Sequence, residues 1–101
     1  MSTFRLLQKA RADVVSIDDH SFGSWGATRT DRHIAALYAA FQRLADDPNL
    51  GRPHLGRRRR GGRIWRLEQG SHVIFFRREK SGDVSVVRVL HERMLPSLHV
   101  G

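Results

Sequence analysis

The feature that most constrains the fold is a change of hydrophobic period near the middle of the chain. The stretch "TRTDRHIAALYAAFQRLADDPNLG", residues 28–51, repeats apolar side chains at helical spacing. Three strand-like runs follow at 63–68, 72–79 and 84–91, and glycine-containing turns of hairpin length separate them. This change of period predicts a helical layer packed on a mostly antiparallel sheet. The helical stripe consists of Ile34, Leu37, Tyr38, Phe41 and Leu44.

The N-terminal third of the chain predicts one strand and one more helix. The alternation in "TFRLL" is typical of a strand, and a second helical stripe follows from Ala10 through Val14 and Ile17, widened by Val15. We expect Gly26 to end this helix, Thr28 or Thr30 to cap the next one, and Pro48 to end that helix. The prediction is a single α+β domain over 1–101 with two layers: an N-terminal strand, an antiparallel helical hairpin and a three-stranded antiparallel sheet.

The charge of the chain is concentrated in its second half. The net charge is +8, and residues 51–101 hold twelve basic and four acidic side chains, while the first half is balanced. The chain has no cysteine, which excludes disulfides and thiolate chemistry. The six histidines show no close metal-ligand spacing, so we expect neither a metal nor a cofactor. The N-terminus has no signal-like apolar core, and no apolar run is long enough to cross a membrane, so we expect a cytoplasmic protein.

Three arginines occupy three different predicted strands. Arg66, Arg77 and Arg88 would form a row across one face of the sheet if the strands pair as hairpins. Such a row repels itself unless an anion lies among the guanidinium groups, and an acidic polypeptide would supply that anion through charge-assisted hydrogen bonds. The alternative is that each guanidinium reaches water or pairs with an acidic residue of the chain itself. The candidates for such pairing are Glu68, Glu79 and Asp83.

The run "GRRRRGGR" contains Arg57 to Arg60 in a predicted loop that links helix to sheet. We weigh three interpretations: a solvated connector, a docking surface for an acidic protein, and a nonspecific contact with nucleic acid. No helix-turn-helix, zinc finger or ribbon signature accompanies it, so we expect no sequence-specific nucleic-acid binding. The aromatic residues Phe41, Phe75, Phe76 and Trp65 fall in the apolar pattern and predict core positions.

The order of elements, with these residues in it, resembles the ParE toxins of the RelE/ParE superfamily. The matching stretches are "ARADVVSID", "AALYAAFQRLADDPNLGRP", "GSHVIFFR" and "VSVVRVLHERM", in the family's order and over nearly the whole chain. The resemblance implies a RelE/ParE-like fold and a toxin of a type II toxin–antitoxin pair. It also implies a ParD-like antitoxin whose C-terminal arm wraps the toxin in a hetero-oligomer. ParE-type members of the superfamily poison DNA gyrase, whereas RelE-type members cleave mRNA on the ribosome.

The sequence favours the first of these two functions, with binding and no bond chemistry. The residues expected to bind the antitoxin are Arg63, Arg66, Arg77, Arg88, Leu37 and Phe41. The residues expected to contact the target are His91, Arg93, Met94 and Leu95. In the alternative, a ribonuclease, His91 acts as acid or base with Arg66, Arg77 and Arg88 near the scissile phosphate. No tyrosine accompanies His91, because Tyr38 is expected on the packed helix face. A third reading is a general RNA- or DNA-binding module.

Overall fold

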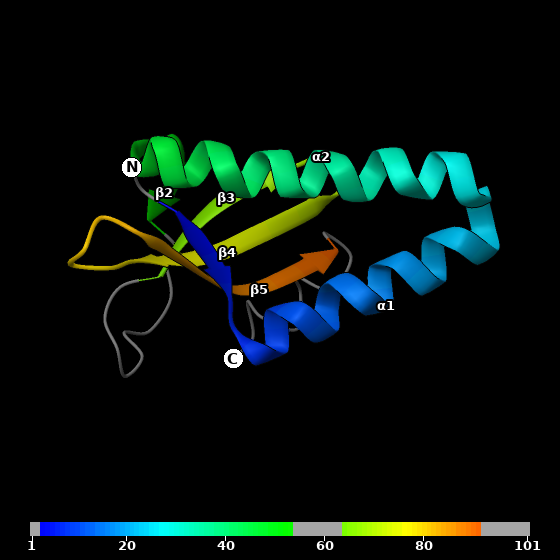
Figure 1. The fold of residues 1–101 in the computed structure, drawn as a ribbon, viewed down its shortest axis with the longest axis horizontal. Coiled ribbons are helices and arrows are strands. Elements are labelled where there is room, and N and C mark those ends of the chain that lie inside the picture. The colour runs from blue at the N-terminus through cyan, green and yellow to red at the C-terminus, as the bar shows by residue number, and fades with distance from the viewer. Residues whose placement is uncertain (1–2, 54–63, 92–101) are drawn as a thin grey trace.

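The fold is a helical hairpin lying on one face of a five-stranded sheet (Figure 1). The computed structural model describes residues 3–53 and 64–91, with the backbone alone at 19–25 and 27–28. The helices are α1 (Gln8–Trp25) and α2 (Ala27–Asp46), followed by the short 3-10 helix η1 (Pro48–Leu50). The strands are β1 (Phe4–Leu6), β2 (Arg52–Pro53), β3 (Trp65–Gln69), β4 (His72–Arg78) and β5 (Val84–His91).

The sheet has the order β1-β5-β4-β3-β2 and is mixed. The predicted antiparallel pairing of the last three strands is confirmed, but the sheet has five strands where three were predicted. The helical hairpin returns the chain so that β1 pairs parallel with β5, and Leu7 N donates to Val86 O at 3.0 Å. Two residues of the predicted loop at 49–62 form β2 at the opposite edge.

Both helices cover the same face of the sheet, which we call the helix face; the opposite face is the outer face. The main core lies between the helices and the sheet. It contains buried side chains of both predicted helical stripes and of alternate strand positions. The helices contribute Ala10 and Val14 from α1 and Leu37, Phe41 and Leu44 from α2. These side chains pack against the strand residues Ile74, Phe76, Val84, Val86 and Val89. A second cluster, Val73, Phe75 and Leu90, lies on the outer face because side chains alternate along each strand. Phe41, Phe75 and Phe76 are therefore core residues as predicted, and Trp65 packs against the core while partly exposed.

The helix boundaries follow from backbone conformation more than from side-chain caps. Gly26 separates the helices with φ of 83°, a value that favours glycine, so the predicted stop is confirmed. The predicted threonine cap is wrong, since the N-cap of α2 is Gly26 and makes no side-chain cap bond. Thr30 is buried inside the first turns, where its hydroxyl donates to Gly26 O at 2.8 Å. Pro48 stops α2 at Asp46, as expected.

Gly51 is packed so closely that a side chain does not fit. A Cβ at this position would lie 2.3 Å from Cζ of Phe76 and 3.1 Å from the carbonyl oxygen of Arg66. Because Phe76 is fully buried, its ring has little room to move. We expect Gly51→Ala to lower the free energy of unfolding by about 1–3 kcal/mol, the usual cost of overpacking. Urea unfolding measures this, with Gly70→Ala as the comparison, where the cost comes from positive φ and not from crowding. An unchanged midpoint for Gly51→Ala would contradict the packing.

Candidate functional site

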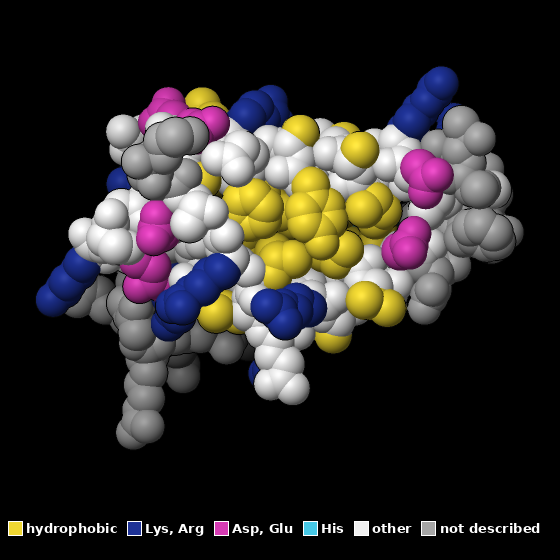
Figure 2. All heavy atoms as spheres, viewed as in Figure 1, with side chains coloured by type: hydrophobic (Ala, Val, Ile, Leu, Met, Phe, Trp, Pro, Cys, Tyr) yellow, Lys and Arg dark blue, Asp and Glu magenta, His cyan; other side chains and the backbone are white. Residues whose placement is uncertain are grey.

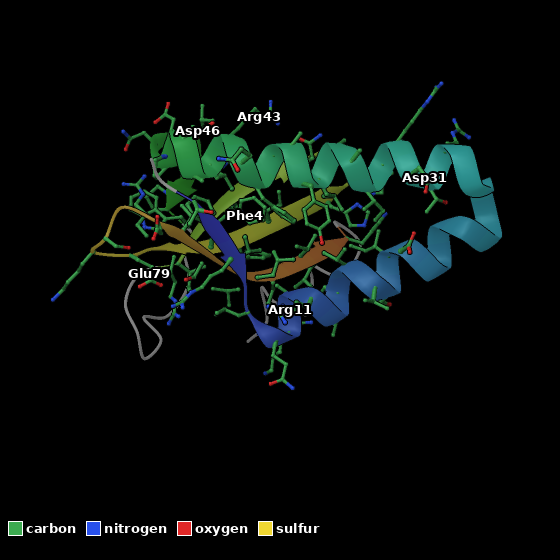
Figure 3. All side chains as sticks on the ribbon, in the orientation of Figure 1. Phe4, Arg11, Asp31, Arg43, Asp46 and Glu79 are labelled. Atoms are coloured by element: carbon green, nitrogen blue, oxygen red, sulfur yellow. The ribbon has the colours of Figure 1, made fainter. Side chains whose placement is uncertain are left out.

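A groove of about 520 Å³ lies where β1, α1 and α2 meet. Figure 2 shows hydrophobic side chains gathered between the two helices, and Figure 3 places Phe4 of β1 at one end and Arg11 of α1 at the border. The apolar walls come from all three elements, and two arginines, Arg5 and Arg11, stand beside them. The apolar residues are Phe4, Leu6, Val14, Val15 and Tyr38. Val15 and Tyr38 are exposed at 60% and 42%, so the groove presents apolar surface to solvent.

The groove changes which residues of α2 are available to a partner. Leu37 and Phe41, expected to bind the antitoxin, have no exposed surface and belong to the main core. Tyr38, expected on the packed face, is instead the exposed aromatic residue of α2. Its ring lies edge-on to Phe41 at 5.4 Å and near Phe4 at 6.3 Å, which fixes its position over the groove. The helical stripe is wide enough to have a solvent-facing edge, and Tyr38 lies on that edge.

The outer face of the sheet carries arginines from every strand. Cross-strand partners share a face, and the register Arg52–Arg66–Phe75–Arg88 runs across β2, β3, β4 and β5. Arg77 belongs to a second row on the same face, because it pairs with Ser85, which in turn pairs with Arg5 of β1. Arg5 Nε donates to Ser85 Oγ at 3.1 Å. The three candidate arginines, Arg66, Arg77 and Arg88, therefore lie on one face, with Arg66 and Arg88 on either side of Phe75.

The arginines of the outer face differ in what they bind within the chain. Arg88 is held by Asp13 of α1 through two hydrogen bonds of 2.8 and 3.0 Å, which raise the pKa of Arg88. Arg52 pairs with Glu68, and Arg77 lies 3.8 Å from Glu79. Of the described residues, none forms an ion pair with Arg66. The Nε atoms of Arg66 and Arg77 are buried without a hydrogen-bond partner. Unsatisfied buried donors cost free energy.

His91 lies on the other side of the sheet from these arginines. It pairs with His72 across β4 and β5, and the two rings are edge-on with centroids 5.2 Å apart. His72 contacts His33 of α2, so the side chains of His72 and His91 lie on the helix face. Side chains alternate along β5, so Arg88 and His91 point to opposite faces. The structure thus does not bring His91 together with Arg66, Arg77 and Arg88.

Burial of His72 makes the stability of the protein depend on pH. Its side chain is buried, and burial together with the charges of His33 and His91 lowers the pKa of His72 to about 4. The unfolded state, with the ordinary pKa of 6.5, therefore binds more protons between pH 6.5 and 4. We expect full stability above pH 6.5 and a loss of about 3 kcal/mol on acidification to pH 4. Urea unfolding of the wild type and of His72→Gln checks this, and an equal loss in both would contradict it.

Some candidate residues lie outside the described part of the chain. These are Arg63, Arg93, Met94, Leu95 and the run Arg57 to Arg60. Sequence analysis also left out three residues that the structure brings to the site: Arg5, Arg52 and Asp13. Arg5 had a signal, since the alternation of "TFRLL" puts it on the face opposite Phe4 and Leu6. Neither helix in the described ranges combines the length and apolarity needed to span a membrane.

Fold and site together define a small α+β domain with an apolar groove on its helical side and a basic outer sheet face. Comparison with solved structures gives the class. The toxin–antitoxin system ParDE from P. aeruginosa matches with a TM-score of 0.70 over 90% of this chain and 96% of that one, at 20% identity. The complex RelBE2 from Mycobacterium tuberculosis matches with a TM-score of 0.63 over 89% and 96%, at 24% identity. The fold is therefore RelE/ParE-like.

Sequence comparison gives the family. Residues 4–96 match the family described as "ParE toxin of type II toxin-antitoxin system, parDE". The protein named Toxin ParE1 from Mycobacterium tuberculosis is 36% identical over 92% of both chains, and Toxin ParE1 from Caulobacter vibrioides is 34% identical over the whole of both. The chain belongs to the ParE toxin family, as the resemblance implied.

Proposed function

We propose that this chain is the toxin of a type II pair, that an acidic antitoxin arm holds it inactive, and that it acts by binding alone. Family membership supports the toxin role. The position of His91 supports action without bond chemistry. An acid–base residue has to reach the same phosphate as the cations that stabilise its charge, and His91 is separated from Arg66 and Arg88 by the sheet.

The antitoxin arm would use both faces of the domain. Its apolar side chains would fill the groove over Val15 and Tyr38, and its carboxylates would bind the guanidinium groups of Arg66 and Arg77. The edge strand β1 connects the two surfaces, since Arg5 borders the groove and also joins the outer-face row through Ser85. An arm that crosses this edge would bury apolar surface on one side and form charge-assisted bonds on the other.

DNA gyrase is the target we propose for the free toxin, in the bacterial cytoplasm. His91 and the C-terminal segment with Arg93, Met94 and Leu95 are the proposed contact with it. The support is the family's association with gyrase poisoning and the separation of His91 from the arginines. The alternative, an mRNA endonuclease with His91 as acid or base, needs His91 and the arginines at one phosphate.

The experiment combines toxicity with two biochemical assays. We expect induced expression of the chain to arrest bacterial growth, and co-expression of the antitoxin to restore it. In the purified system we expect inhibition of gyrase supercoiling and no cleavage of ribosome-bound mRNA. Cleaved mRNA with active gyrase, abolished in His91→Ala, would overturn the proposal in favour of the ribonuclease. His91→Ala is expected to weaken gyrase inhibition at most, because His91 would be one contact of several.

A further inference from the structure

Three histidines meet where α2 crosses the ends of β4 and β5, away from the groove and the outer face. His33 Nε2 lies 3.2 Å from His72 Nδ1, with ring centroids 4.9 Å apart and planes inclined by 46°. The ring of His91 lies edge-on to the ring of His72, with an interplanar angle of 87°. His72 is 5% exposed, whereas His33 is only partly buried.

The distance of 3.2 Å between His33 Nε2 and His72 Nδ1 is close to that between two imidazole nitrogens that share a metal ion. A tetrahedral ion bound at about 2.05 Å sets its two ligand nitrogens about 3.3 Å apart, and the ring centres about 5.2 Å apart. A straight N–H···N hydrogen bond of the observed length would set the ring centres about 5.5 Å apart. The observed centroid distance of 4.9 Å is below both values. At least one ring is therefore turned off the line between the nitrogens, as chelation requires.

The ligand chemistry of imidazole decides which metal ions the pair can bind. Imidazole binds metals through the lone pair of its neutral form. Nitrogen ligands select Zn²⁺, Ni²⁺ or Cu²⁺ over Mg²⁺ and Ca²⁺, which prefer oxygen.

We propose that His33 and His72 form a two-histidine site for a transition-metal ion such as Ni²⁺ or Zn²⁺, which links α2 to β4. In the described ranges no group of three or more histidine, aspartate or glutamate side chains is arranged to hold a metal, so the described part of the chain supplies two ligands. The ion stabilises the folded state because only folding brings residues 39 positions apart together. This proposal does not depend on the antitoxin or on the target.

The test is thermal unfolding of the full chain titrated with Ni²⁺ alone. We expect the melting temperature to rise by about 5–10 °C when free Ni²⁺ exceeds its Kd tenfold, and EDTA to reverse the rise. His33→Gln should abolish the rise, because the amide can still hydrogen bond to His72 but supplies no imidazole. The triple variant His20→Gln, His54→Gln, His99→Gln removes three other histidines and should keep it.

Three results would overturn the proposal: no rise in the wild type, an equal rise in His33→Gln, or loss of the rise in the triple variant. The last would indicate adventitious binding by the other histidines. A second measurement does not depend on stability. Cu²⁺ bound to the folded wild type at pH 7 should show coupling to two imidazole nitrogens in its electron paramagnetic resonance spectrum. Coupling of Cu²⁺ to a single nitrogen would also contradict the proposed site. So would a Cu²⁺ spectrum of folded His33→Gln that is the same as that of the wild type.

Discussion

Replacing Tyr38 with glutamate is expected to weaken binding of the antitoxin by at least about 100-fold, while the toxin stays folded. Tyr38 is the exposed aromatic residue of the groove and is held in place by Phe4 and Phe41. Exposed aromatic residues that become buried in an interface often contribute 2 kcal/mol or more, and a tenfold change in Kd corresponds to about 1.4 kcal/mol. The glutamate would also bring a negative charge toward an acidic arm. Isothermal titration calorimetry with the purified antitoxin measures the change.

Leu50→Glu is the matched control for Tyr38→Glu. Leu50 is 49% exposed, similar to Tyr38, but it lies in η1 and is not part of the groove wall. The same change of an exposed apolar residue to glutamate is therefore made away from the proposed contact, and we expect less than a fivefold change in Kd. Equal losses in the two variants would show that net charge, and not the groove, determines affinity.

Removal of the Asp13 carboxylate should cause the largest loss of stability among single changes of charged residues. Asp13 accepts two hydrogen bonds from Arg88 and a third from Val89 N at 2.9 Å, so one carboxylate joins α1 to the backbone and side chain of β5. We expect Asp13→Ala to lower the free energy of unfolding by about 2–3 kcal/mol, since Arg88 is partly solvated and recovers some hydration. The melting temperature should fall by about 10–15 °C.

Two further variants separate the Asp13 contact from a general effect of charge. Asp46→Ala removes an exposed carboxylate that accepts, among the described residues, only from Gln42, and should change the free energy of unfolding by less than about 0.5 kcal/mol. In a double-mutant cycle, Asp13→Ala should cost much less in an Arg88→Ala background, where only the Val89 bond remains. Additive losses in the cycle would contradict the pairing of Asp13 with Arg88.

The sequence predicted the fold class and the helical hairpin well because both depend on local signals. Hydrophobic spacing placed α1 and α2, and the conformational limits of Gly26 and Pro48 placed their ends. The parallel pairing of β1 with β5 could not be predicted, because it joins residues about 80 positions apart and depends on how the hairpin packs. Strand β2 could not be predicted either, because it is only two residues long and is defined by its pairing with β3.

The candidate site was predictable where alternation along a strand determines which face of the sheet a side chain lies on. Arg66, Arg77 and Arg88 were expected in one row, but only Arg66 and Arg88 share a row, in register with Phe75, while Arg77 lies in another row of the same face. Exposure within a wide helical stripe was harder to predict. Leu37, Tyr38 and Phe41 look alike in the sequence, yet only Tyr38 reaches solvent. Asp13 gave no signal, since its partner lies 75 positions away.

The central claim is that an acidic polypeptide binds the arginines of the outer sheet face. Its most direct test is the affinity of the antitoxin for the double variant Arg66→Gln, Arg77→Gln, which neutralises the two guanidinium groups with unsatisfied Nε atoms. The control, Arg29→Gln, Arg32→Gln, removes the same charge from exposed positions of α2. We predict a loss of at least about 100-fold in the first and less than about fivefold in the second, because charge-assisted bonds contribute roughly 1.5–3 kcal/mol each. Equal affinities in the two double variants, both folded, would contradict the claim.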